Sequence, residues 1–132
     1  MAREPSSSPT ELELEILKVL WKKSPRTVRE VQEALIAESS GRELAHTSVI
    51  TMLHIMVRKN FLKSKKDGKS YLFWPKVSED QVSQGMLGDL LQRVFDGSAK
   101  NVVLNLLELA DLDAEELSEL RRLIEKKRKE QN

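Results

Sequence analysis

The chain has 132 residues, of which 33% are charged and 39% hydrophobic, so it can bury the core of one domain with an appendage. It has no cysteine and only two histidines, His46 and His54, which excludes a disulfide framework and a thiolate metal site and predicts no cofactor. No apolar run approaches the roughly 20 residues that span a membrane, and the N-terminus lacks a secretory signal. We therefore expect a cytoplasmic protein without membrane insertion.

The chain begins with a polar tail, and two predicted helices follow it. Residues 1–9 are rich in Pro and Ser, which predicts a disordered tail. Thr-x-x-Glu capping boxes begin apolar stretches at Thr10 and at Thr27. The spacing of the apolar residues after them predicts helices over 10–23 and 27–38.

A third helix is predicted over 45–59, with different residue types on its two sides. Its core side comprises Val49, Leu53, Met56 and Val57, and its polar side comprises Thr47, Thr51, His54 and Arg58, flanked by Ser48 and Ile55. Hydroxyl, imidazole and guanidinium groups can bond phosphates or base edges in DNA. Taken alone, this polar side is equally compatible with an ordinary solvated helix surface.

Two short alternating runs over 61–66 and 69–74 come next, and Asp67-Gly68 between them predicts a hairpin. In that register Lys66 lies opposite Lys69, a like-charged pair that a bound anion would stabilise. Three helices before a basic hairpin form the element order of a winged helix, in which the third helix enters the major groove. The hairpin residues expected on flanking phosphates are Lys63, Lys65, Lys66 and Lys69.

The net charge of +1 conceals two regions of opposite sign. Residues 41–76 contain eight Lys and Arg and two Asp and Glu, a net charge of +6, whereas residues 77–120 contain two and ten, a net charge of −8. The basic region predicts an anionic partner, and the acidic region is a poor ligand for DNA.

The second half of the chain is predicted to form three more helices, over about 79–96, around 102–109 and from Asp113 onward. About 55 residues without a disulfide or metal bury too little surface to stand alone, so the excess of leucine predicts a homodimer. The residues expected at the dimer interface are Leu90, Val94, Leu106, Leu107, Leu117, Leu120 and Ile124.

These elements predict a mainly α protein with a small β-hairpin. We expect a winged helix-turn-helix DNA-binding domain over 10–76, a helical dimerisation domain over 77–128 and a disordered tail over 129–132. The chain shows no Gly-rich phosphate loop, no H-E-x-x-H motif and no Ser/His/Asp set in a credible context, so we expect no enzyme. The alternative is a winged-helix protein-interaction module whose basic face is incidental, and the salt dependence of DNA binding distinguishes the two.

Five stretches in this order resemble the penicillinase-repressor family of bacterial transcription regulators (BlaI/MecI type) over nearly the whole chain. They are TELELEILKVLW (Thr10–Trp21), Thr27–Glu30, TSVITMLHIMVRKNFL (Thr47–Leu62), KKDGKSYLFWP (Lys65–Pro75) and Val102–Lys127. The resemblance implies a dimeric winged-helix repressor that binds double-stranded DNA at an inverted-repeat operator over a promoter. Ile55 stands where the family usually has Arg, and Asn60 stands where it usually has Gly.

The resemblance also implies how repression ends in the antibiotic-responsive members. There, a membrane-bound metalloprotease sensor triggers cleavage of the repressor at an Asn–Phe bond in the dimerisation region. The matching bond here is Asn105–Leu106, where leucine replaces phenylalanine.

Overall fold

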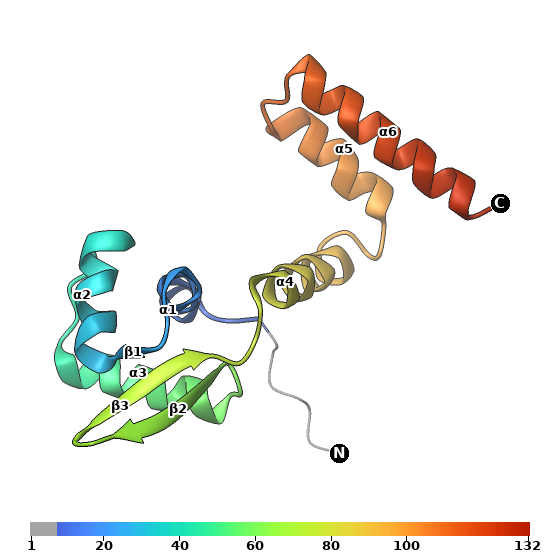
Figure 1. Ribbon diagram of the computed structural model, residues 1–132. Coiled ribbons are helices and arrows are strands. Elements are labelled where there is room, and N and C mark those ends of the chain that lie inside the picture. The colour runs from blue at the N-terminus through green and yellow to red at the C-terminus, as the bar shows by residue number, and fades with distance from the viewer. Residues whose placement is uncertain (1–7) are drawn as a thin grey trace. The chain divides into compact units, whose positions relative to one another are not determined.

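The computed structural model describes residues 8–132, which form six helices and three short strands (Figure 1). In chain order they are α1 (Glu11–Lys22), β1 (Arg26–Thr27), α2 (Val28–Glu38), α3 (His46–Arg58), β2 (Leu62–Asp67), β3 (Ser70–Pro75), α4 (Glu79–Arg93), α5 (Ala99–Leu109) and α6 (Ala114–Glu130). The described residues divide into two compact units, unit 1 up to Asp89 and unit 2 from Leu90 onward. Most of the expected tail 1–9 lies outside the described residues.

Unit 1 has the element order and sheet of a winged helix, which confirms the predicted fold class. Three helices precede an antiparallel hairpin, and the sheet has the order β1-β3-β2. Strand β1, which the sequence did not predict, pairs Arg26 with Phe73 and Thr27 with Leu72. Two residues are too few to show strand alternation, and Thr27 also caps α2.

The core of unit 1 extends beyond the hairpin into α4. Its fully buried side chains come from all three N-terminal helices and the sheet: Ile16, Leu17, Leu20, Val31, Leu35, Val49, Leu53, Met56, Leu62 and Phe73. Val82 of α4 is buried in the same cluster, and the Trp21 indole donates a hydrogen bond of 2.9 Å to the Val77 carbonyl. The first part of α4 therefore belongs to unit 1, whereas the expected domain boundary lay at residues 76 and 77.

Helix α3 is held at its C-terminal end by a capping motif and an ion pair. Asn60 has a φ of 68°, and the Phe61 amide donates to the Met56 carbonyl at 2.9 Å, as in a Schellman motif. The adjacent Lys59 ammonium donates to the Glu13 carboxylate of α1 at 2.8 Å. Burial of the Glu13 carboxyl opposes ionisation, but the hydrogen bonds from Lys59 and Thr10 outweigh it and hold its pKa below the usual range.

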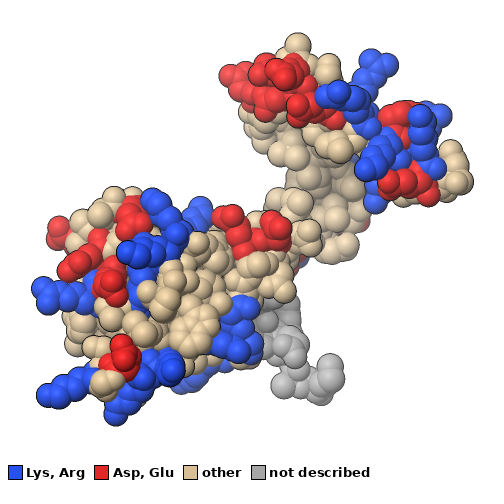
Figure 2. Space-filling view, in the orientation of Figure 1, with Lys and Arg blue, Asp and Glu red and all other residues tan. Residues whose placement is uncertain are grey.

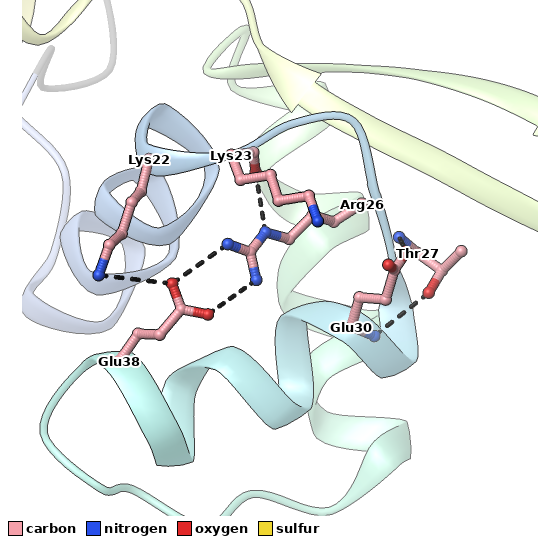
Figure 3. Close-up of polar contacts among 6 residues, drawn as sticks. All are labelled: Lys22, Lys23, Arg26, Thr27, Glu30 and Glu38. Carbon is pink, nitrogen blue, oxygen red and sulfur yellow. Dashed lines mark hydrogen bonds and ion pairs between the residues drawn. The ribbon is translucent and has the colours of Figure 1, made fainter.

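Helix α2 is anchored at both ends (Figure 3). At its start, Thr27 and Glu30 form the predicted capping box. Near its end, the Glu38 carboxylate accepts two hydrogen bonds from the buried Arg26 guanidinium, at 3.0 and 3.2 Å. Those bonds lower the pKa of Glu38. The Arg26 Nε group also donates to the Lys23 carbonyl at 2.8 Å, so α2 is fixed to the turn that follows α1.

The hairpin register differs from the predicted one by two residues. Asp67 pairs with Ser70, which leaves Gly68 and Lys69 as the loop, and Lys66 pairs with Tyr71. The predicted opposition of Lys66 and Lys69 is therefore wrong. Gly68, with a φ of 63°, occupies the first loop position, where a two-residue hairpin loop requires a positive φ. A shift of two residues leaves every side chain on its predicted face.

Unit 2 consists of the end of α4 and the helices α5 and α6. Helix α4 ends at Arg93, before the expected residue 96, because Asp96 and Gly97 have positive φ values of 50° and 82°. Asp113 begins α6 with the predicted capping box. Helix α6 continues to Glu130 and thus includes the first part of the expected tail 129–132.

Candidate nucleic-acid interface

The predicted polar side of α3 is exposed along its length. Thr47, Ser48, Thr51, His54 and Arg58 are all exposed, whereas on the core side of the same helix Val49, Leu53 and Met56 are fully buried and Val57 is partly buried. At about 100° per residue, Thr47, Thr51, His54 and Arg58 lie within an arc of roughly 60°, and Ser48 lies about 60° beyond the edge of that arc. The helix therefore presents hydroxyl, imidazole and guanidinium groups on one surface.

The start of α3 is held by Gln32 of α2, a contact that the sequence did not reveal. Ala45 precedes the helix and supplies no side-chain cap. Instead, the Gln32 amide donates to the Leu44 carbonyl at 2.9 Å, and its Oε1 lies 3.3 Å from Nδ1 of His46. Further along, the Thr51 hydroxyl donates to the Thr47 carbonyl at 2.9 Å, which leaves its oxygen lone pairs and methyl group to face a ligand.

The turn between α2 and α3 is fastened to α1 by a single carboxylate. Glu15 accepts hydrogen bonds from the hydroxyls of Ser39 at 3.0 Å and Ser40 at 2.6 Å, and pairs with Arg42 at 3.1 Å. The hydrogen bond from Ser40 is the main cause of the lowered pKa of Glu15. These contacts, together with Lys59 and Gln32, fix α3 at both ends and in the turn before it.

His54 joins the α3 surface to the hairpin. Its ring meets Tyr71 and Phe73 of β3 edge-on, with centroids 6.2 and 6.1 Å apart. The structure thus places His54 at the border of the polar side rather than at its centre. Tyr71 is exposed, and sequence reasoning missed it. Tyr71 lies two residues before the buried Phe73 on the same strand, and this spacing could have placed it on the same face, toward α3.

The hairpin lysines are exposed but do not share one face. Lys63, Lys65, Lys66 and Lys69 are all exposed. Lys66 lies on the same face as the buried Leu62 and next to Tyr71, which is the side toward α3, whereas Lys65 alternates to the opposite face. Figure 2 shows Lys and Arg gathered over the end of the hairpin, at lower left.

The residues predicted at a dimer interface remain uncovered in the chain. Leu90, Val94, Leu106, Leu107, Leu117, Leu120 and Ile124 are between 39% and 63% exposed. Within residues 77–128, five further large apolar side chains are exposed that were not predicted at the interface: Leu87, Val103, Leu104, Leu109 and Leu123. In the described chain no residue of α5 or α6 is buried.

The candidate cleavage bond lies inside a helix. Asn105 and Leu106 are both within α5, and the Asn105 amide donates to the Asn101 carbonyl at 2.8 Å. The bond is therefore held in a helical backbone on an exposed surface.

Comparison with known proteins identifies the family. The model of the penicillinase repressor family matches residues 9–126. The chain belongs to this family. It is 31% identical to the penicillinase repressor of Bacillus licheniformis over 116 residues, which cover 88% of each chain. It is 32% identical to the transcriptional regulator BlaI of Mycobacterium tuberculosis, over 86% of this chain and 80% of that one. The predicted resemblance is confirmed.

The chain also resembles a solved structure. A solution structure of the DNA-binding domain of the repressor BlaI covers 58% of this chain and 90% of its own, at 27% identity and a TM-score of 0.48. None of the helices in residues 8–132 is long and apolar enough to cross a membrane.

Proposed function

We propose that this chain is a dimeric repressor that binds an inverted-repeat operator and thereby occludes a promoter. The observation that carries the proposal is the exposed polar side of α3 beside a lysine-rich hairpin on a winged-helix unit. A helix of this kind fits the major groove while the hairpin reaches the neighbouring backbone. The relatives named as repressors support the same activity.

Each residue of the surface has a proposed role. Ser48, Thr51 and His54 face the floor of the major groove, and Thr47 and Arg58 hold phosphates. Lys65, Lys66 and Lys69 contact the flanking backbone. The DNA-binding domain proposed for these contacts spans residues 10–76.

Residues 77–128 are proposed to form the dimer. The support is the apolar surface of α5 and α6, which is too extensive for a monomer to leave in water. A single winged helix binds one half-site. Joining two makes the second contact nearly intramolecular, with an effective concentration in the millimolar range for a short connection. Dimerisation therefore supplies most of the affinity for a full operator.

Repression is proposed to end by cleavage at Asn105–Leu106, triggered by a membrane-bound metalloprotease sensor. The bond lies in α5, so cleavage requires local unwinding, and its rate follows the population of the opened helix. A cut there separates α6, which carries Leu117 and Leu120, from the DNA-binding domain. The persistence of intact chain during induction would remove this part of the proposal and leave the dimer standing.

The decisive experiment measures DNA binding against salt. A duplex that the chain selects from a random pool is titrated by fluorescence anisotropy between about 50 and 200 mM salt, beside a scrambled duplex. We expect affinity to fall by several orders of magnitude over that range and to favour the selected palindrome. Weak binding whose affinity changes with neither salt concentration nor duplex sequence would instead support the protein-interaction module.

A further inference from the structure

A hollow of about 420 Å³ lies between the exposed side of α3 and the hairpin. Three elements wall it: the start of α2, the side of α3 nearest the hairpin, and the hairpin from its loop into β3. Residues from each element include Val28 and Arg29, His46 and Ile50, and Lys69 and Tyr71. The hollow therefore joins the two surfaces proposed to contact DNA and adds α2 to them.

The charged residues that line this hollow are all basic. Among the described residues that line it, none is acidic, and Arg29 and Lys69 bring cations from elements about 40 residues apart. Two smaller hollows of unit 1, of about 370 and 270 Å³, both include the carboxylate of Glu38. Of these three hollows, the one between α3 and the hairpin is therefore the best suited to an anion.

Arg29 is free to turn toward such an anion. Its Nε lies 3.3 Å from the Glu33 carboxylate, one helical turn away, but the two side chains are 82% and 67% exposed. An exposed pair of this kind contributes little, so a phosphate can replace it at small cost. Lys69 stands in the two-residue hairpin loop, where its ammonium is exposed.

The floor of the hollow is apolar. Val28 and Ile50 line it, and the edges of the Tyr71 and Phe73 rings meet His54 beside it. A surface with an apolar floor and two cations complements a deoxyribose with its phosphates, in which a largely apolar ring lies between charged groups. It is less suited to a free inorganic anion, which has no apolar part.

We propose that this hollow seats the sugar–phosphate backbone of the DNA strand that runs between the two grooves, with its phosphates held by Arg29 and Lys69. The proposal rests on the proposed function. If α3 occupies the major groove and the hairpin reaches the next groove, the strand that separates those grooves passes between them. The hollow lies at that crossing, so α2 and the hairpin loop contact the same or adjacent phosphates.

A methylphosphonate scan tests this directly. The duplex is one of roughly 24 base pairs, enough for two half-sites one helical turn apart, that the full chain selects from a random pool. Each phosphate in turn is replaced by the uncharged methylphosphonate, and affinity is measured for wild type, Arg29→Gln and Lys69→Gln. Lys18→Gln, which removes an exposed lysine of α1 outside this hollow, is the matched control.

Because two protomers are proposed to bind the two half-sites, we expect Arg29→Gln and Lys69→Gln each to lower the salt slope by about two, one for each protomer. In each half-site, each variant should also abolish the effect of neutralising one phosphate, and the phosphates affected by the two variants should be the same or adjacent. Lys18→Gln should keep the wild-type profile. Arg29→Lys retains the charge, so it should keep most of the wild-type sensitivity to phosphate neutralisation that Arg29→Gln loses. A purely structural role for Arg29 would not give this result.

Two outcomes would overturn the hollow as a backbone seat. In the first, Arg29→Gln is folded and has the wild-type profile. In the second, the phosphates of Arg29 and Lys69 lie more than one nucleotide apart. If Thr51→Ala and Lys66→Gln still weaken binding in either case, the proposed function stands and only the hollow fails. Failure of the wild-type chain to bind any duplex would overturn the proposed function itself.

Discussion

The two units of the chain use leucine in opposite ways. In unit 1, Leu17, Leu35 and Leu53 are fully buried, and one chain fills the core. In unit 2, Leu106 and Leu120 are about half exposed, and no residue of α5 or α6 is buried in the described chain. Similar apolar content thus gives a complete domain in one case and an incomplete one in the other. Under the proposed function, a second copy completes unit 2.

The largest expected effect comes from placing a charge on the uncovered surface of unit 2. Leu120→Asp buries an unpaired carboxylate in the proposed dimer, so we expect monomers and a fall of orders of magnitude in affinity for the full operator. Sedimentation velocity, run beside the duplex titration, measures both. Ser118→Asp adds the same charge to α6 away from the leucine stripe and should leave the dimer intact. A dimeric Leu120→Asp protein would contradict the assignment.

A core truncation compares the two units directly. Leu53→Ala empties a fully buried site of unit 1 and should cost about 2–5 kcal/mol of unfolding free energy. Both tryptophans, Trp21 and Trp74, lie in unit 1, so their fluorescence reports the unfolding of that unit alone. Leu120→Ala removes the same atoms from unit 2 and should leave the tryptophan-detected midpoint unchanged. Equal shifts would show that the units unfold as one.

Much of unit 1 could be predicted because its signals are local. The capping boxes at Thr10 and Thr27 and the apolar spacing of α3 depend only on neighbouring residues, and all three helices begin within one or two residues of the predicted positions. The predicted hairpin register was wrong because the sequence Asp67-Gly68-Lys69 is compatible with two different two-residue loops. Only the backbone geometry shows that Gly68 takes the first loop position.

Features that depend on distant residues could not be predicted. Strand β1, the hold of Gln32 on the start of α3 and the contact of His54 with Tyr71 all join segments that the sequence separates. The burial of Val82 in the core of unit 1 could not be predicted for the same reason, since the periodicity of α4 does not reveal which core Val82 enters. Among the proposed DNA contacts, Arg29 was missed because it lies on α2 and only the fold brings it beside the hairpin.

Within unit 1, truncating side chains on the polar side of α3 should lower the affinity for DNA far more than it lowers the free energy of unfolding. Thr51→Ala should cost on the order of 1–3 kcal/mol of binding free energy and relax specificity, because the threonine is proposed to face base edges. Arg58→Ala should weaken selected and scrambled duplexes alike, because a phosphate contact carries no sequence information. Anisotropy titrations of both duplexes separate the two. Losses of less than about twofold for both variants would remove the α3 surface from the interface.

Each hairpin lysine should contribute less to the binding free energy than Thr51, and its contribution should depend on the salt concentration. Replacing Lys65, Lys66 and Lys69 by Gln should lower the salt slope by about one per lost contact, and by at most about three for each protomer. Lys66 lies on the face toward α3 and Lys65 on the opposite face, so Lys66→Gln should account for more of the loss than Lys65→Gln. The slope of log affinity against log salt gives each value. An unchanged slope in the triple variant would exclude the hairpin from the complex.

The smallest expected effect concerns acid stability, and it again separates the units. The carboxyls whose pKa is lowered, among them Glu13, Glu15 and Glu38, lie in unit 1. A carboxyl with a folded pKa below its unfolded one stabilises the fold above the unfolded value of about 4.5. That stabilisation disappears as the pH falls through the lower, folded pKa.

Glu13→Gln removes one such carboxyl, so the loss of stability below about pH 4.5 should become shallower than in wild type. Lys59 is left beside a neutral amide, but it is partly exposed and keeps its hydration, so the variant should remain folded near neutral pH with a lower midpoint. Tryptophan-detected melting between about pH 3 and 7 measures the profile, and Glu11→Gln removes an exposed charge from the same helical turn as the control. Parallel profiles for wild type and Glu13→Gln would mean that the Glu13–Lys59 contact does not link the ends of α1 and α3 energetically.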